Sequence, residues 1–287
     1  MTTIGLISDT HMPHRRRALP SAVFEILAGV DVVLHGGDVG ELWVLEQLSR
    51  IAPVFAVFGN DEPEETRKAL PHLIPFNAGG QRMLLVHGHA LDTEYEFRLR
   101  AEVDWASKLR LWSSYGRDHG AKIVIYGHTH IPGVIETDGV TLINPGAVSS
   151  AGLMRQTIST VARMEVTADA PPQVTIYDLA TGAIHTPETD LTLPFEATRV
   201  KYGELIFAPD LMAQFQWFRT ALLERFGLPF LDPLLGELYA RWEGDAPPLT
   251  VEGMAAAYRG AQAQVPAEAW DVLWANPDFA QFREPKR

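Results

Sequence analysis

The chain has 287 residues, of which 46% are hydrophobic and 21% are charged, and its formal net charge is -12 at pH 7. This length and composition are typical of a globular protein with a substantial core, while the negative charge disfavours nonspecific binding to nucleic acid or to an anionic membrane surface. The absence of cysteine excludes disulfides, thiolate zinc sites and cysteine nucleophiles, so histidine, carboxylate or amide groups would have to hold any metal ion. A nucleic-acid partner would need a local basic patch, which the overall charge does not favour.

The first residues, "MTTIGLISDTH", do not show the charged and then apolar segments of a signal peptide. No apolar run approaches the roughly 20 residues that are needed to cross a bilayer. We therefore expect a cytoplasmic protein with no membrane partner.

Six short apolar segments predict buried strands, because they are continuous rather than alternating, as in sheets that are covered on both faces. They span residues 3–8, 31–36, 53–59, 82–88, 122–127 and 140–146. Segments with helical spacing of apolar residues lie between several of them, at residues 19–29, 41–52 and 94–115. This alternation predicts an α/β fold with a mixed sheet.

After Gly146 the pattern changes. Two β segments, at residues 159–166 and 173–179, follow each other without a helix between them, so they could form a second sheet packed on the first. From about residue 190 onward helix formers dominate, with four of the seven tryptophans. We predict a domain over residues 1–189 and a helical C-terminal extension over residues 190–287, which could form its own small core, cover the active site or mediate self-association into a homo-oligomer.

Polar side chains that suit metal binding or catalysis follow each of the first five predicted strands. Taken singly, Asp9 could be a helix cap, and Asp38 and Asn60 could be turn residues. His128 and His130 are two residues apart, so both could point to the same side at the end of one strand. Open α/β sheets collect their ligands at the carboxyl ends of strands, and the agreement of five strand ends favours one shared site.

Seven of these side chains provide two carboxylates, one amide and four imidazoles, which are too many for one tetrahedral or octahedral ion. They are Asp9, His11, Asp38, Asn60, His87, His128 and His130. We expect two divalent transition-metal ions, with manganese favoured and iron, zinc, cobalt or nickel as alternatives. Two ions about 3.5 to 4 Å apart lower the pKa of a bridging water and orient the hydroxide for in-line attack on phosphorus.

The motifs and their order resemble the calcineurin-like metallophosphoesterase superfamily. They are "DTH" at 9–11, "GD" at 37–38, "GNDE" at 59–62, "HGH" at 87–89 and "GHTH" at 127–130. The later "NPGAVS" at 144–149 is similar to the small prokaryotic phosphodiesterase branch. The resemblance covers residues 1 to about 182 and implies a four-layered α/β/β/α sandwich with metal-dependent phosphoester hydrolase activity.

The resemblance also implies roles for individual residues. It places one ion on Asp9, His11, Asp38 and His130 and the other on Asp38, Asn60, His87 and His128, so that Asp38 bridges them. It makes Asp38, Asn60, Asp61 and His89 the candidate catalytic residues. His35 and His89 flank the ligands and are expected to orient carboxylates or phosphate.

Asp61 departs from the family pattern, in which this position is often His or Cys. An ionised carboxylate cannot donate a hydrogen bond and repels phosphate. A diester carries one fewer negative charge than a monoester, so we expect a phosphodiesterase that acts on a small phosphodiester or nucleotide-type substrate. Phosphomonoesterase activity is the alternative.

The segment "HMPHRRRALP" is similar to a subgroup that contains the retromer subunit with this fold. Arg15, Arg16 and Arg17 could hold a phosphate beside His11, or they could lie in a solvated loop. The same subgroup supplies another alternative, a non-catalytic protein-binding scaffold. The presence of every ligand position in this chain favours an enzyme.

Overall fold

The computed structural model describes residues 1–101, 104–150 and 152–283. The chain divides into two compact units. Unit 1 comprises Met1–Ala151 and Gln156–Glu204, and unit 2 comprises Gly152–Arg155 and Leu205–Arg287. Residues 190–204 are thus grouped with unit 1, whereas the predicted boundary lies after residue 189. Independent folding of the two parts stays a prediction.

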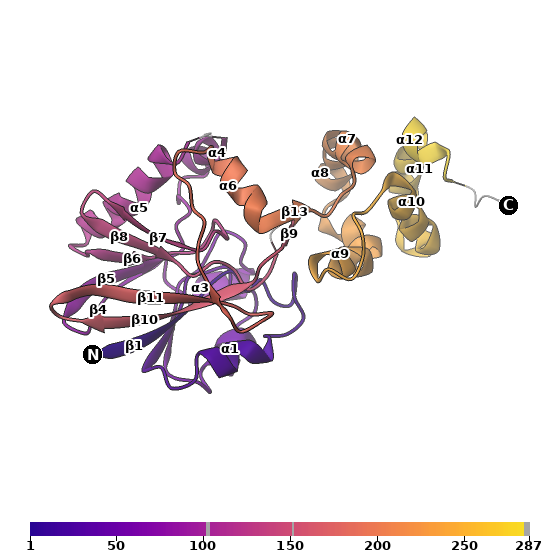
Figure 1. Cartoon of the computed structure of the whole chain (residues 1–287). Helices are drawn as coiled ribbons and strands as arrows, with labels where there is room; N and C mark the ends of the chain where they lie inside the picture. Colours follow the sequence, from indigo (N-terminus) through magenta and orange to yellow (C-terminus); the bar gives the residue numbers. More distant parts are fainter. Residues whose placement is uncertain (102–103, 151, 284–287) are drawn as a thin grey trace. The chain divides into compact units, whose positions relative to one another are not determined.

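The first sheet of unit 1 combines the start of the chain with its later strands, in the order β12-β11-β10-β1-β2-β3. Figure 1 shows β11, β10 and β1 next to one another. β10 pairs antiparallel with β1 from Thr2↔Val166 to Leu6↔Ala162, whereas β1, β2 and β3 are parallel. The expectation that the late strands form a separate sheet is therefore wrong, because they extend the first sheet along the open side of β1. The bounds are β1 (Thr2–Ile7), β2 (Val32–His35), β3 (Val54–Ala56), β10 (Thr160–Thr167), β11 (Ala170–Asp178) and β12 (Ile184–His185).

The second sheet has the order β4-β5-β6-β8-β7, with β5, β6 and β8 parallel and the outer strands antiparallel. β4 and β7 were not predicted, because edge strands with partly exposed residues lack a continuous apolar run. A separate two-stranded sheet pairs β9 (Met154–Gln156) with β13 (Gly203–Leu205). The bounds of the five-stranded sheet are β4 (Leu73–Ala78), β5 (Gln81–Val86), β6 (Ile123–Ile125), β7 (Gly133–Thr137) and β8 (Val140–Asn144).

Three hydrophobic clusters separate four layers in unit 1. One lies between the sheets, one between the first sheet and helices α1 and α2, and one between the second sheet and α5. Representative pairs are Leu6 with Leu85, Val33 with Val23, and Val124 with Trp112. The predicted four-layered α/β/β/α sandwich is confirmed. The helices are α1 (Ser21–Ile26), α2 (Trp43–Leu48), α3 (Glu64–Ala69), α4 (Thr93–Ala101), α5 (Ala106–Asp118) and α6 (Phe195–Tyr202).

The predicted helix over residues 94–115 is wrong as one element, because α4 and α5 are separate. Residues 102–103 of that prediction lie outside the described residues, and Asp104 and Trp105 are not helical. Asp104 Oδ1 accepts a hydrogen bond from Ala106 N at 3.0 Å. An aspartate side chain that accepts a hydrogen bond from the backbone N–H two residues later competes with helical hydrogen bonding. A new helix therefore starts at Ala106.

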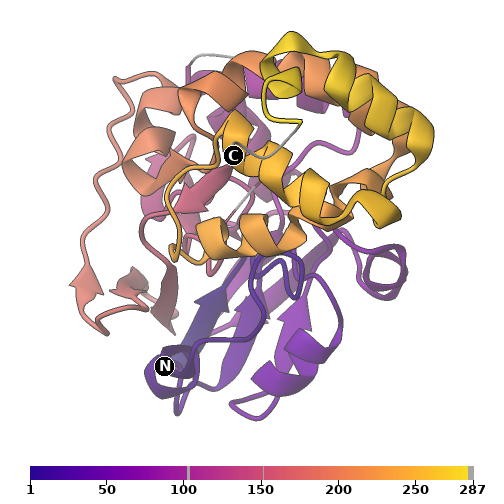
Figure 2. The same ribbon diagram turned by 90° about the vertical axis from the view of Figure 1, so that its right-hand side faces the viewer.

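Unit 2 is helical (Figures 1 and 2). It has its own apolar core. Leu211, Tyr258, Leu273 and Phe279 are buried in this core. The helices of unit 2 confirm the predicted helical character of the C-terminal extension. The helices are α7 (Pro209–Phe218), α8 (Glu224–Phe226), α9 (Leu235–Trp242), α10 (Val251–Gly260), α11 (Ala267–Ala275) and α12 (Pro277–Ala280), with a π-helical segment (Arg219–Leu223) and 3-10 segments (Leu228–Leu234 and Gln262–Gln264).

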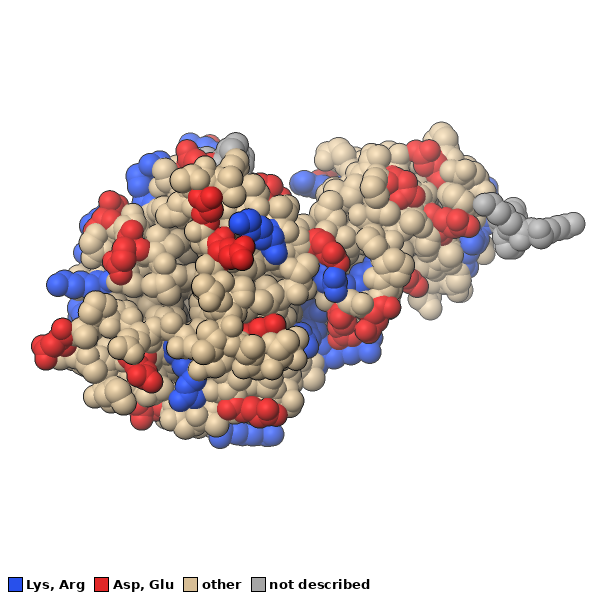
Figure 3. Space-filling view, in the orientation of Figure 1, with Lys and Arg blue, Asp and Glu red and all other residues tan. Residues whose placement is uncertain are grey.

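The surface carries charge of both signs. On the face shown in Figure 3, acidic and basic side chains are interspersed on both units. This face therefore lacks the clustered lysines and arginines that bind nucleic acid. None of the helices formed by the described residues is long and apolar enough to cross a membrane.

Candidate metal centre

The loops that follow β1 and β2 run side by side at the carboxyl edge of the first sheet. Asp9 N donates to Gly37 O at 3.0 Å, and His11 N donates to Asp38 O at 2.9 Å. These backbone hydrogen bonds bring Asp9, His11 and Asp38 together. The local pairing of two loops thus turns separate sequence motifs into one site.

Five candidate ligands hold their backbone in the left-handed region. The φ angles are 53° at Asp9, 47° at His11, 51° at Asp38, 68° at His128 and 60° at His130. Among the described residues, Asp138 is the one other non-glycine residue with positive φ. This conformation costs about 1–3 kcal/mol per residue and persists where surrounding structure enforces it, typically at functional sites. The fold therefore enforces the positions of these five side chains.

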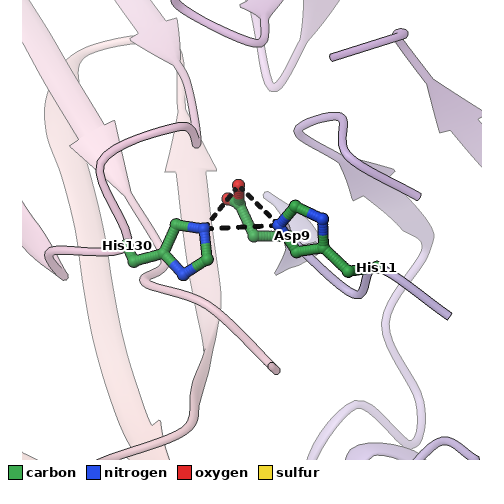
Figure 4. A group of neighbouring side chains, drawn as sticks. All are labelled: Asp9, His11 and His130. Atoms are coloured by element: carbon green, nitrogen blue, oxygen red, sulfur yellow. Dashed lines mark hydrogen bonds and ion pairs between the residues drawn. The ribbon is translucent and has the colours of Figure 1, made fainter. Parts of the chain in front are cut away.

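Asp9, His11 and His130 form one group of potential metal ligands (Figure 4). His130 Nε2 lies 3.2 Å from Asp9 Oδ1 and 3.4 Å from His11 Nε2. His11 Nε2 lies 3.9 Å from Asp9 Oδ1. All three side chains are buried. Their donor atoms converge in the way that ligands of one ion do.

A second group of potential ligands contains Asp9, Asp38 and His87. His87 Nε2 lies 3.3 Å from Asp38 Oδ2 and 3.2 Å from Asn60 Oδ1. The other ring nitrogen, Nδ1, lies 2.7 Å from Gly36 O and so carries a proton. In the neutral ring Nε2 is therefore the nitrogen with the lone pair, and it faces the oxygens of Asp38 and Asn60.

Asp9 belongs to both groups, but its oxygens already accept hydrogen bonds. His128 N lies 3.3 Å from Oδ1 and 3.1 Å from Oδ2. Ser8 Oγ donates to Oδ2 at 2.6 Å. Asp9 is thus held firmly by the loops after β1 and β6.

Asp38 has one oxygen that faces imidazoles from both sides. Its Oδ1 accepts a hydrogen bond from Asp61 N at 2.8 Å, while Oδ2 lies 3.6 Å from His11 Nε2 and 3.3 Å from His87 Nε2. Gly59 permits this arrangement, because a Cβ there would lie 2.0 Å from Asp38 Oδ1. Asp38 Oδ2 therefore lies within 3.6 Å of imidazole nitrogens from two different loops.

The carboxylates and histidines of the site stabilise each other's charged forms. Burial opposes ionisation of Asp9, but the charge and hydrogen bond of His130 lower its pKa to about 2. Burial likewise opposes ionisation of Asp38, yet His87 and His11 hold its pKa well below the usual range. Burial lowers the pKa of His87, and Asp38 outweighs this effect and raises it to about 9. Metal binding would therefore displace a proton from His87.

His128 is placed differently from the other predicted ligands. Its Nε2 lies 3.0 Å from Glu96 Oε1, and its ring centroid lies 5.1 Å from that of His87. Within the described part of the chain, it is in neither group of three ligands. Glu96 was not predicted, because a contact between α4 and the end of β6 has no local sequence signal.

Glu62 connects two ligand-bearing loops and was also missed. Oε1 accepts hydrogen bonds from Val39 N at 2.7 Å and Gly59 N at 3.3 Å, and Oε2 accepts one from Gly40 N at 2.9 Å. Burial raises the pKa of Glu62 to about 7. Its signal was present in the sequence, because Glu62 is the last residue of the motif "GNDE".

His35 forms hydrogen bonds with the loops that follow β1 and β2. Its Nδ1 accepts a hydrogen bond from Gly37 N at 3.2 Å, and its Nε2 lies 3.0 Å from Thr10 Oγ1. Burial lowers the pKa of His35 to about 3, so the ring is neutral. Because Nδ1 is the acceptor, Nε2 carries the proton and donates a hydrogen bond to the hydroxyl oxygen of Thr10.

His89 is buried in an aromatic setting next to the proposed ligands. Its ring lies 5.4 Å from that of His87 and 6.0 Å from that of Phe58, between centroids. Neither of its ring nitrogens has a hydrogen-bond partner among the described residues. Burial, followed by the charges of His87 and His128, lowers the pKa of His89 to about 3.

Asp61 lies at the edge of the site, with its side chain 51% exposed. Its Oδ2 lies 3.0 Å from Arg15 Nη2 and 3.5 Å from His11 Nδ1. The hydrogen bond from His11 lowers the pKa of Asp61, so this carboxylate is ionised. Of the three neighbouring arginines, Arg15 therefore offsets the charge of Asp61, whereas Arg16 donates to Val148 O at 3.3 Å. Arg17 is exposed.

The donor set fits divalent metal ions. It combines hard carboxylate and amide oxygens with imidazole nitrogens, which suits manganese, iron, zinc, cobalt or nickel. The fit rests on the convergence of Nε2 atoms from His11, His87 and His130 on carboxylate oxygens.

Residues 2–169, more than half of the chain, match the calcineurin-like phosphoesterase superfamily domain. The chain therefore belongs to the calcineurin-like phosphoesterase superfamily, as the motifs predicted.

Archaeal relatives cover about half of the chain. A probable metallophosphoesterase of Methanothermobacter thermautotrophicus is 34% identical over 148 residues, which are 50% of this chain and 76% of that protein. Probable metallophosphoesterase MJ0623 of Methanocaldococcus jannaschii is 36% identical over 145 residues, 50% of this chain and 67% of that protein. Phosphodiesterase MJ0936 of the same organism is 27% identical over 157 residues, 50% of this chain and 82% of that protein. Together with the family, these relatives support metal-dependent phosphoesterase activity.

Solved structures with the same fold include two Vps29 proteins. Vps29 of Entamoeba histolytica complexed with zinc has a TM-score of 0.50 and 23% identity, covering 64% of this chain and 96% of that one. Vps29 of Chaetomium thermophilum has a TM-score of 0.51 and 18% identity, covering 64% of this chain and 94% of that one. At these identities the likeness shows the fold alone.

Proposed function

We propose that the chain is a phosphodiesterase that works with two divalent metal ions. Asp9, His11, Asp38 and His130 would hold one ion, and Asp38, Asn60, His87 and His128 would hold the other. Manganese is the favoured metal, with iron, zinc, cobalt or nickel as alternatives. The substrate would be a small phosphodiester or a nucleotide-type diester.

One observation carries this proposal: Asp38 Oδ2 lies 3.6 Å from His11 Nε2 and 3.3 Å from His87 Nε2. A carboxylate oxygen that is close to imidazole nitrogens from two loops is suited to be a ligand shared by two ions. His130 Nε2 lies 3.2 Å from Asp9 Oδ1, and Asn60 Oδ1 lies 3.2 Å from His87 Nε2, so each of the two imidazoles near Asp38 has a further potential ligand close to it or to Asp9.

Divalent ions bound by these residues would supply activation of water and neutralisation of charge on the phosphoryl group. The protein's own residues orient the donors for that task. Gly36 O keeps the proton of His87 on Nδ1 and so presents Nε2 to the site. His89, whose ring nitrogens have no partner among the described residues, offers a hydrogen-bond donor for a phosphate oxygen.

The preference for diesters rests on Asp61. Its ionised carboxylate lies 3.5 Å from the ring of the proposed ligand His11, so it adds negative charge beside the proposed substrate position. A monoester dianion is repelled more strongly than a diester monoanion. Arg15 offsets part of this charge, so we expect a preference rather than an absolute selection.

The first experiment measures metal content and hydrolysis with the same preparation. We expect two ions per chain by elemental analysis after reconstitution, loss of activity with a chelator, and recovery with manganese. A chromogenic aryl diester should be cleaved faster than the matching monoester. At most one ion would contradict the two-ion proposal, and faster cleavage of the monoester at neutral pH would contradict the role given to Asp61. Two bound ions without hydrolysis of a broad substrate panel would favour a protein-binding scaffold.

A further inference from the structure

Glu96, which lies outside the family motifs, has a buried carboxylate that contacts the proposed metal ligand His128. Glu96 lies in the first turn of α4, and its side chain is buried. Asp92 holds the start of this helix, because its Oδ1 accepts from Tyr95 N at 2.7 Å and its O accepts from Glu96 N at 2.9 Å. The position of Glu96 is therefore set by the helix start.

Both carboxylate oxygens of Glu96 contact groups at the site. Oε2 accepts a hydrogen bond from Ala90 N at 2.7 Å, and Oε1 lies 3.0 Å from His128 Nε2. Ala90 follows the motif "HGH" after β5, whereas His128 begins the histidine pair after β6. Glu96 thus connects two ligand-bearing strand ends.

The contact of 3.0 Å between Glu96 Oε1 and His128 Nε2 bears on where the proton of His128 lies. An ionised carboxylate can only accept, so the nitrogen that faces it must carry a proton. An imidazole whose Nε2 carries that proton can offer only Nδ1 to a metal ion. Histidines that bind metals commonly donate their second N–H to a carboxylate, which fixes the tautomer and orientation of the ring.

We propose that Glu96 is a positioning residue that keeps the proton of His128 on Nε2, so that His128 binds the second ion through Nδ1. This inference rests on the proposed two-ion centre. The ring of His128 stands beside that of His87, whose Nε2 faces Asp38 and Asn60, so the orientation of His128 bears on the same ion.

A conservative variant separates this role from a purely structural one. In Glu96→Gln, the amide oxygen can still accept from Ala90 N, while the amide NH₂ faces His128 Nε2. The amide would then donate to Nε2 and favour the tautomer with the proton on Nδ1. Side-chain size and the loop contact are retained, but the nitrogen presented to the ion is wrong.

The binding test uses the full-length protein and titrates Zn²⁺ or Mn²⁺ by calorimetry. Glu96→Gln should bind one of the two ions about 10–100-fold more weakly and leave the other unchanged, which is the usual effect of removing a carboxylate that orients a ligand. The matched control is Glu94→Gln, since Glu94 is an exposed glutamate of the same helix. It should bind both ions as the unmodified protein does.

A second measurement needs no variant of Glu96. Long-range ¹H–¹⁵N NMR of the zinc-loaded protein should show the proton of His128 on Nε2, with the signal assigned by its loss in His128→Gln. A proton on Nδ1 would overturn the inference even if Glu96→Gln failed to fold. Equal or tighter binding of both ions by a folded Glu96→Gln would also overturn it, while leaving the two-ion proposal intact. An unmodified protein that binds at most one ion would contradict both.

Discussion

The two units bury different kinds of residue. Unit 1 buries charged and polar side chains at its proposed site, whereas the buried side chains of this kind among the described residues of unit 2 are Arg241 and Asn276. All described non-glycine residues with positive φ also belong to unit 1. Unit 2 instead buries apolar side chains such as Leu273 and Phe279.

This difference indicates that unit 1 contains features that lower stability at its proposed site. Buried charges and left-handed backbone destabilise a fold unless partners and packing hold them in place. In unit 1 the three apolar clusters and the paired loops provide that support. Among the described residues, both groups of candidate ligands lie in unit 1.

The largest effect on the site is expected for Asp38→Ala, because this change removes the oxygen that lies close to both His11 Nε2 and His87 Nε2. Both ions should be lost, and kcat/KM for a diester should fall by about 10³-fold or more, which corresponds to several kcal/mol of transition-state stabilisation. Calorimetric metal titration and the diester assay measure the two quantities. The control in unit 2 is Asp271→Ala, an exposed aspartate of α11. Retention of both ions by Asp38→Ala would contradict the shared-ligand assignment.

Two glycine substitutions compare backbone strain in the units. Gly40 has φ of 87°, and a Cβ there would lie 2.0 Å from Met12 O, so Gly40→Ala should destabilise unit 1 by about 2–4 kcal/mol. A Cβ at Gly236, in α9 of unit 2, meets no atom within 4 Å. Gly236→Ala should stabilise the protein by up to about 1 kcal/mol. Scanning calorimetry measures the change in stability of both variants. Similar changes in Gly40→Ala and Gly236→Ala would contradict the predicted difference.

Core truncations test whether metal binding depends on one unit only. Leu85, in β5, and Leu273, in α11, are both fully buried. Each change to alanine should lower the free energy of unfolding by about 2–5 kcal/mol. Leu85→Ala should also weaken Mn²⁺ binding, because β5 leads directly to His87, whereas Leu273→Ala should not. Equal weakening by Leu273→Ala would show that the units are coupled.

The smallest effect is expected for Asp61→Asn. Half-exposed ion pairs contribute about 0.2–1 kcal/mol, so the ratio of monoester to diester hydrolysis should rise by about two- to fivefold. Asp138→Asn is the matched control, since Asp138 is also 51% exposed and pairs with Arg117 at 3.1 Å away from the proposed site. An unchanged ratio in Asp61→Asn would show that Asp61 does not select the substrate.

The sequence alone determined the superfamily, the layered fold and a set of ligand candidates. This was possible because the motifs are local: each lies within a few residues of a strand's carboxyl end. The structure brings Asp9, His11 and His130 into one group and Asp38 and His87, with Asp9, into another. The roles of all seven proposed ligands stay predictions until metal binding is measured.

Tertiary structure decided which strands pair and which side chains surround the ligands. A continuous apolar run shows that a strand is buried, but it does not specify the neighbouring strand, so the pairing of β10 with β1 could not be read from the pattern. The edge strand β4 alternates in exposure, so it lacks the continuous apolar run by which the other strands were predicted. Glu96 reaches His128 because α4 packs near the end of β6, and a contact between residues far apart in sequence depends on packing rather than on local spacing.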